Sequence, residues 1–501
     1  MEPIYNELKL ERLISKSIVQ AFIEGDIPMP AGREAERILG VESHIRNDAA
    51  RCSHGSVQAE GTLMLNILCL DAQEQTFDVH ASTRYNHSIP LENVQEGMDA
   101  EITPQLYDLR TDLRDRRVHV EAVAELNTLV RDDEPIETLT DVVGAGELYK
   151  RYNETDLSKS RELGSTSLRV HETLSAPGAA HVLRANISPH ISEVKLAENG
   201  LDISGTLYVS VLYENGEAAL IQLNERLPFE QFMQVELDAT CGDISIRPEL
   251  KDYSVGISAA EGMLDLDANL ELFAACITKE QLKTLEDFYS LDGSVNCLQQ
   301  EIELLMPIMN VSELCPIIEN LKIPEQLPQS GRVVYTSFRP VVLNLFDDNG
   351  KLALNALLIT EVVYATAEGA LFKFSEDMPV KCTLDVPFSS EAIVALNPLE
   401  VRANGTGRML NVEYLLEVLA RTFIMEQLTL AAGAEETEAK PRESGIMVAL
   451  APEGDTVWNI AKRFRVTPEQ LLSWNEGLVE PIREGTEILV LSRPGKKRRP
   501  S

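Results

Sequence analysis

The stretch SGTLYVSVLYENGEAALIQLNERL, residues 204–227, contains the pattern on which the fold class depends. An apolar run rich in β-branched residues comes first. A short turn of small and acidic residues follows, containing Asn215 and Gly216, and then a second run alternates apolar and polar positions. Two such runs joined at Asn-Gly predict a β-hairpin. This segment therefore predicts strands that pair through a tight turn.

Two further stretches repeat this pattern at near-equal intervals along the chain. They are EGTLMLNILCLDAQEQTFDVHAST, residues 60–83, and LNALLITEVVYATAEGALFKFSED, residues 354–377. A proline followed by a strand-like run precedes each copy, at Pro30, Pro177 and Pro328. Downstream, RVHVEAVAELNTL, GMLDLDANLELFAACI and RMLNVEYLLEVLARTF all alternate with the period of a half-buried strand. Three elements recurring in one order indicate an internal repeat.

These observations predict a mainly β protein with three similar β-sandwich-like domains. We place them at residues 20–130, 165–277 and 300–424, each with five or more strands. The stretches between them, 138–153 and 279–291, are charged and are expected to be more helical. The second of them opens with helix formers at amphipathic spacing. Residues 429–445 are small and charged, so we expect a flexible linker.

Residues 446–492 form a separate small domain whose local signals predict the order β-α-α-β. Asp455 and Thr456 stand where a helix N-cap belongs, and the residues after them repeat apolar positions on one helical face. Thr467 and Gln470 form a capping-box pair around Pro468, which predicts the start of a second helix. The last segment, 493–501, is a basic tail that contains Lys496, Lys497, Arg498 and Arg499. These residues are solvated, contact an acidic partner or an anionic membrane next to the small domain, or screen the chain's own acidic residues.

The stretches GDTVWNIA, from Gly454, and VTPEQLLSWN, from Val466, resemble the two helical signatures of the LysM module. This resemblance implies a shallow groove between two loops that binds N-acetylglucosamine polymers. The residues carried over to this groove are Gly454, Asp455, Thr456, Val457, Trp458, Asn475, Glu476, Gly477, Leu478, Pro481 and Ile482. The same residue types also cap helices and fill the core, and Trp458 is as compatible with a core position as with ligand contact. Both interpretations stay open from the sequence.

Three similar β-domains followed by one LysM resemble the SPOCS-domain family of clostridial spore-coat morphogenetic proteins, of the SipL and SpoVID type. The resemblance implies a scaffold made in the mother-cell cytoplasm that lies at the forespore surface or spore coat. Its implied partners are a SpoIVA-like coat ATPase or other coat proteins. The alternative is a protein that binds peptidoglycan, or its lipid-linked precursor, through the LysM.

Composition limits the other function classes. With 45 Lys and Arg against 80 Asp and Glu, the formal net charge is −35, which disfavours nucleic-acid binding. No apolar stretch is long enough to span a membrane, and the N-terminus does not resemble a secretory signal. The seven cysteines show no C-x-x-C spacing and several lie in apolar runs, so we expect small core residues in a reducing compartment.

No motif in the chain predicts catalysis. The eight histidines form no metal-binding motif, and those in RVHVEAV and FDVHAS are expected on exposed strand faces. Neither a nucleophile motif nor a phosphate-binding loop occurs. We therefore expect no enzyme activity, no cofactor and no metal.

Overall fold

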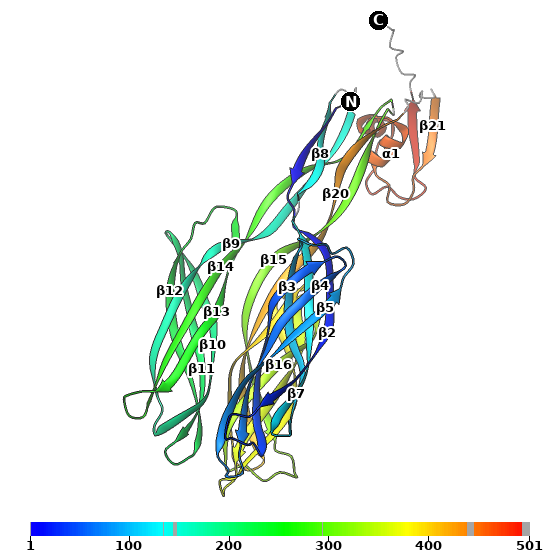
Figure 1. Cartoon of the computed structure of the whole chain (residues 1–501). Helices are drawn as coiled ribbons and strands as arrows, with labels where there is room; N and C mark the ends of the chain where they lie inside the picture. The colour runs from blue at the N-terminus through cyan, green and yellow to red at the C-terminus, as the bar shows by residue number, and fades with distance from the viewer. Residues whose placement is uncertain (1, 134, 144–147, 293, 438–444, 493–501) are drawn as a thin grey trace.

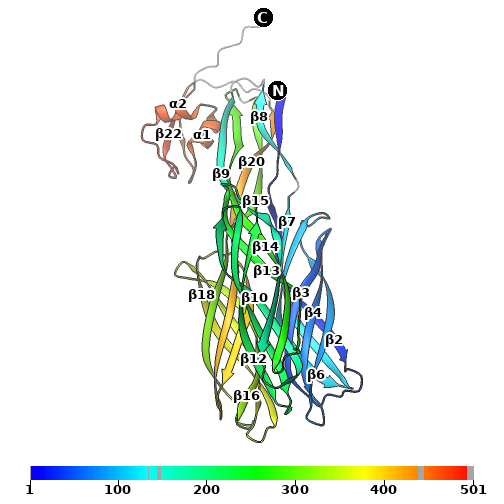
Figure 2. The same ribbon diagram turned by 90° about the vertical axis from the view of Figure 1, so that its left-hand side faces the viewer.

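The computed structural model describes residues 2–133, 135–143, 148–292, 294–437 and 445–492. Within them the chain is almost entirely β, and the helices are α1 (Val457–Phe464) and α2 (Pro468–Trp474), close to the C-terminus. The mainly β prediction is confirmed. Three elongated β-sandwiches lie side by side, and a narrow stalk rises from one end of them to the small C-terminal module (Figures 1 and 2).

The first sandwich consists of two three-stranded antiparallel layers. One layer has the order β3-β4-β5 and the other β2-β7-β6. The bounds are β2 Arg12–Pro28, β3 Arg37–Ser53, β4 Ser56–Leu70, β5 Thr76–Pro90, β6 Asp99–Arg114 and β7 Arg117–Asp132. Alternate apolar side chains from both layers, such as Leu63 and Val120, fill the space between them.

The second and third sandwiches have the same strand order. Their layers are β10-β11-β12 with β9-β14-β13, and β16-β17-β18 with β15-β20-β19. The second contains β9 Leu148–Ser175, β10 Ala179–Ala197, β11 Gly200–Asn215, β12 Leu220–Gln234, β13 Cys241–Ile257 and β14 Met263–Ser290. The third contains β15 Val295–Lys322, β16 Arg332–Asp348, β17 Lys351–Ala365, β18 Leu371–Pro387, β19 Ile393–Asn404 and β20 Met409–Glu436. The three stretches that predicted hairpins are β4-β5, β11-β12 and β17-β18.

The stalk is made by strands that continue beyond the sandwiches. β9, β14, β15 and β20 are each 28 residues long, and their far halves pair as two ribbons, β9-β14 and β15-β20. A third ribbon pairs β1 (Glu2–Leu8) with β8 (Ile136–Val143) in line with β2 and β7. Side chains from the ribbons, including Leu139, Phe288 and Ala431, form the stalk core. The predicted bounds of the second and third domains fall inside these long strands, because each strand belongs to both a sandwich and the stalk. The predicted bounds of the first domain fall inside β2 and β7.

The prediction of helical character in residues 138–153 and 279–291 is wrong. The described parts of both stretches are stalk strands, and residues 144–147 lie outside the described residues. In β14 the register shifts between Leu285 and Asp287. This irregularity lets Leu285 and Phe288 face the same core, so their three-residue spacing imitates a helical period.

The predicted linker at 429–445 is also corrected. Residues up to Glu436 belong to β20 and pair with β15 as far as Val295, while 438–444 lie outside the described residues. Leu430 and Ala431 are buried in the stalk. Ladder hydrogen bonds to a neighbouring strand order residues 429–436, and such bonds need no large apolar side chains.

The three sandwiches contact one another in a closed ring. The contacts join the layers β3-β4-β5, β10-β11-β12 and β16-β17-β18. The last strand of each of these layers touches the first strand of the next one: β5 contacts β10, β12 contacts β16, and β18 contacts β3. Equivalent strand ends also meet in a shared apolar cluster that includes Leu70, Leu212 and Val363. A cavity of about 2110 Å³ lies between the sandwiches and is lined by residues of all three.

A buried arginine ties the ring together. Arg184, on β10, is 2% exposed. Its Nη2 donates to Asp78 Oδ1 at 2.7 Å and to the Asn66 carbonyl at 2.8 Å, both in the first sandwich. Its Nη1 donates to Tyr335 Oη in the third at 3.1 Å. One guanidinium therefore joins all three sandwiches.

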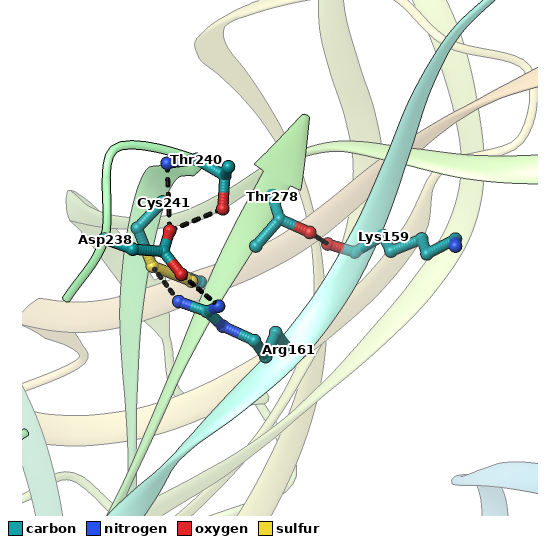
Figure 3. The surroundings of a disulfide bond; sticks show 7 residues. Lys159, Arg161, Asp238, Thr240, Cys241 and Thr278 are labelled. Carbon is teal, nitrogen blue, oxygen red and sulfur yellow. Dashed lines mark hydrogen bonds and ion pairs between the residues drawn. A yellow bond between two sulfur atoms is a disulfide. The ribbon is translucent and has the colours of Figure 1, made fainter. Parts of the chain in front are cut away.

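The expectation that all cysteines are reduced is wrong for one pair. Cys241 and Cys276 form a disulfide between β13 and β14, and Figure 3 shows its surroundings. Arg161 lies beside it, with Nη2 3.2 Å from Cys241 Sγ and Nη1 2.6 Å from Asp238 Oδ2. The bridging depends on the strand register, which includes a shift between Cys241 and Ile244, and no spacing motif reveals it.

The prediction that the histidines of two alternating runs lie on exposed strand faces is correct for one of the two residues. His80, in FDVHAS, is exposed, but His119, in RVHVEAV, is 8% exposed. Acidic neighbours cover the His119 ring: Nδ1 lies 2.9 Å from Asp26 Oδ1 and Nε2 lies 3.1 Å from Glu121 Oε1. Alternation alone identified neither the cross-strand partner Asp26 nor the contact with Glu121, two residues along the same strand.

Candidate functional site

The C-terminal module has the predicted β-α-α-β order, with β21 (Gly445–Leu450) and β22 (Glu487–Ser492) paired antiparallel. Thr456 caps α1, and its hydroxyl accepts a hydrogen bond from the Asn459 amide at 3.1 Å. Thr467 and Gln470 form the capping box of α2, with Pro468 in its first turn. The local signals therefore act as expected.

Two loops of the module are held together by backbone hydrogen bonds. The Gly454 amide donates to the Ile482 carbonyl at 3.2 Å, and the Ile482 amide donates to the Asp455 carbonyl at 3.0 Å. The Val457 amide donates to Glu480 Oε1 at 2.5 Å. These are the two loops predicted to border a ligand groove, and they lie next to each other.

Several of the residues predicted to contact a ligand are instead buried or hydrogen-bonded within the module. Val457 and Ile482 are core residues, 8% and 1% exposed. Asp455 is buried and pairs with Arg463 at 2.8 Å. Asn475 joins α2 to β22, since its side chain donates to the Leu471 and Leu489 carbonyls and accepts from the Leu489 amide.

The rest of the predicted set lies at the surface between the loops. Gly454, Glu476, Gly477 and Pro481 are exposed, and Leu478 is half-buried. Thr456 is half-buried and caps α1. Gly454 and Gly477 have φ values of +73° and +87°, a region that favours glycine and allows close backbone approach. The binding role of these surface residues stays a prediction.

Trp458 contacts the stalk. Its Nε1 donates to Asp287 Oδ2, on β14, at 2.7 Å. The Tyr289 ring meets the indole edge-on at 5.1 Å between centroids, and the Arg151 guanidinium lies 5.3 Å from the indole centroid. Trp458 is therefore part of the docking interface between the module and the stalk, where neither original interpretation placed it.

The docking interface also contains a charge pair whose carboxylate is buried. Asp287 is 3% exposed, and its Oδ1 lies 2.6 Å from Lys462 Nζ. Tyr289 Oη donates to the Val466 carbonyl at 2.6 Å. Sequence analysis missed Asp287 and Tyr289, because no local pattern links them to a module that follows more than a hundred and fifty residues later.

The face of the module away from the stalk is apolar and exposed. Ile446, Val448 and Leu450 alternate along β21 and are 78%, 59% and 66% exposed. Their strand partners place Leu489 and Leu491 on the same face, with the exposed Glu487 opposite Leu450 at its end. We call the five aliphatic residues the outer face. Figure 1 shows α1 on the stalk side of the module and β21 on the far side.

Comparison with known families adds to this geometry. Residues 179–258 match the family model described as SipL, SPOCS domain. The second sandwich carries a SPOCS domain. The match spans β10 to β13 and leaves the stalk-forming strands β9 and β14 entirely outside it. No match was found among curated proteins or among solved structures.

Residues 453–490 match the LysM family model, so the resemblance of the C-terminal module is confirmed. SPOCS and LysM together indicate a sporulation-related protein with a module of the peptidoglycan-binding class. Both families are non-catalytic binding or scaffold domains.

Within the ranges that the structure describes, no group of three or more His, Cys, Asp and Glu side chains is placed to hold a metal ion. Neither of the described helices is long and apolar enough to cross a membrane.

Proposed function

We propose that this protein is a non-enzymatic scaffold of the spore envelope. In this proposal it is made in the mother-cell cytoplasm, docks on a SpoIVA-type coat ATPase at the forespore surface through its LysM, and helps the coat encase the forespore. The combination of SPOCS and LysM supports a role in sporulation. The threefold strand order supports the further proposal that the first and third sandwiches are SPOCS-like repeats.

The observation that carries protein docking is the outer face of the LysM. Five aliphatic side chains on a two-stranded sheet offer an apolar surface, with the exposed Glu487 at its end opposite Leu450. Exposed apolar patches of this kind are typical of protein interaction sites. Trp458, the aromatic residue in the first groove loop, is held by Asp287 instead.

The architecture suits a scaffold that presents the LysM at a fixed position. Stalk ribbons carry the module away from the sandwiches, and the ion pair between Lys462 and the buried Asp287 holds it against the stalk. The sandwich ring leaves the outer surfaces of the three units for further coat partners. In this arrangement the LysM end of the protein docks on the forespore surface, and the sandwich end binds further coat proteins.

One observation favours the alternative of glycan binding. The exposed Gly454 and Gly477, both with positive φ, border adjacent loops. Such a border gives a sugar polymer access to backbone groups. A peptidoglycan-binding protein, or one that binds the lipid-linked precursor, would use this groove and not the outer face.

The test titrates the full chain against the SpoIVA-type ATPase and, separately, against peptidoglycan fragments. An outer-face variant, Val448→Lys with Leu450→Lys, changes two exposed side chains. A matched groove variant, Glu476→Lys with Glu453→Lys, changes two exposed side chains at the loops. Circular dichroism checks that both variants keep the fold.

We expect the outer-face variant to lose ATPase binding by at least tenfold while the groove variant keeps it. Saturable peptidoglycan binding that only the groove variant weakens, without ATPase binding, would establish the glycan alternative instead. Binding to neither would contradict both functions.

A further inference from the structure

Two cysteines meet across the core of the third sandwich. Cys315 lies on β15 and Cys382 on β18, which belong to opposite layers. Their sulfur atoms are 2.8 Å apart. Cys382 is 3% exposed, and Cys315 is half-buried. Two thiols are thus in direct contact, and one of them is open to solvent.

We propose that Cys315 and Cys382 are an oxidation site, which forms an inter-layer disulfide when the protein meets a small-molecule disulfide such as oxidised glutathione. A disulfide bond is about 2.05 Å long, so the two sulfur atoms need to approach by less than about one ångström. Packed strands already hold the two side chains facing each other.

The surroundings of the two thiols assign their order of reaction. The hydrogen bond from Cys382 lowers the pKa of Cys315, while the same bond and burial raise the pKa of Cys382. The thiolate is the attacking form. Cys315, which is also the more accessible thiol, therefore attacks first, and Cys382 resolves the intermediate.

The chemistry balances in two exchange steps. The Cys315 thiolate attacks one sulfur of oxidised glutathione, forming a mixed disulfide and releasing one glutathione thiolate. Cys382 then gives up its proton, and its thiolate attacks the Cys315 sulfur, releasing the second glutathione. The protein loses two hydrogens, and the glutathione disulfide is reduced to two thiols.

The new bond would differ in effect from Cys241–Cys276. That disulfide joins neighbouring strands of one layer, whereas Cys315–Cys382 would join the two layers themselves. The cross-linked residues are 67 positions apart. Closing so long a loop restricts the unfolded chain, and it holds together the sandwich from which β15 and β20 continue into the stalk.

The experiment treats the full chain with excess oxidised glutathione, blocks free thiols with iodoacetamide and maps the peptides without reduction. We expect a peptide pair linked through Cys315 and Cys382, two fewer free thiols, and a higher urea midpoint that returns to its starting value with dithiothreitol. Cys297→Ser, at another half-buried cysteine, serves as the control and should still form the link.

Single variants test the order of reaction. Cys382→Ser should accumulate glutathione on Cys315, because nothing resolves the mixed disulfide. Cys315→Ser should leave Cys382 unmodified, because its sulfur is buried. Separately alkylated Cys315 and Cys382 in the treated wild-type chain, or a stable mixed disulfide on Cys315 there, would overturn the proposal.

Discussion

Trp458 Nε1 and Asp287 Oδ2 form a hydrogen bond of 2.7 Å that joins the LysM to the stalk. Because the same carboxylate pairs with Lys462 and is 3% exposed, the module is anchored by a buried, fully partnered charge. Such a pair fixes geometry well, since removing one partner leaves the other charge buried. The position of the LysM is therefore a property of the fold.

Replacing Asp287 with Ala should loosen the LysM from the stalk. The indole would lose its acceptor and Lys462 its counter-ion, so Trp458 becomes more exposed to water. Tryptophan emission should shift to longer wavelength, and acrylamide should quench it more strongly. Glu453→Gln, an exposed loop residue of the module, should leave both signals unchanged.

Two helix α1 variants should separate docking from folding. Ile460→Ala removes a core side chain that is 1% exposed and should destabilise the module by about 2–5 kcal/mol. Trp458→Ala should mainly release the docking contact. In hydrogen exchange, Ile460→Ala should speed exchange throughout β22, whereas Trp458→Ala should speed it at residues 285–290. Fast hydrogen exchange throughout β22 in the Trp458→Ala variant would show instead that Trp458 belongs to the core of the module.

Arg184→Met should destabilise the sandwich ring by about 3–5 kcal/mol, because the buried Asp78 carboxylate loses its cation. The free energy of urea unfolding measures this loss. Lys195→Met is the matched control, since its pair with Glu193 is exposed and its loss should change little. An unchanged midpoint for Arg184→Met would show that the ring does not depend on this side chain.

Gly205→Ala should destabilise the second sandwich. Gly205 faces Phe229 across β11 and β12, and a Cβ there would lie 2.2 Å from Phe229 Cζ and 2.6 Å from the His190 carbonyl oxygen. Overpacking of this kind costs about 1–3 kcal/mol. Thermal unfolding should show the loss. A Cβ at Gly216 meets nothing within 4 Å, so Gly216→Ala should unfold at the wild-type temperature.

The contact between the second and third sandwiches should weaken in acid. Burial raises the pKa of Glu417, but hydrogen bonds from His190, Ser312 and Asn397 outweigh it, and the pKa lies below the ordinary 4.5. A depressed folded-state pKa means that the ionised carboxylate contributes stability above pH 4.5 and loses it as the pH falls through the folded-state value.

Glu417→Gln tests this pH dependence. At pH 7 the variant should be less stable than the wild type by about 1.5–3 kcal/mol, and the difference should shrink as the pH falls below 4.5. Urea midpoints at several pH values measure it. A difference that stays constant down to pH 3 would contradict the assignment.

The sequence by itself determined the local elements. Alternation around Asn215 and Gly216 predicted the hairpin β11-β12, and Thr456, Thr467 and Gln470 predicted both helix starts, because these signals act between near neighbours. The LysM resemblance rests on such local residues as well. Strand pairing over long distances, by contrast, has no local signature.

Only the tertiary structure decided how these elements combine. Leu285 and Phe288 have a helix-like spacing but lie in a strand whose register shifts between them. Residues 429–436 have the composition of a linker but form part of a strand, because they pair with β15 through ladder hydrogen bonds. Trp458 and Asp287, Arg184 and Asp78, and Cys315 and Cys382 come together because long strands bring distant residues into contact. Such pairs depend on register and packing between layers, which composition and periodicity do not encode.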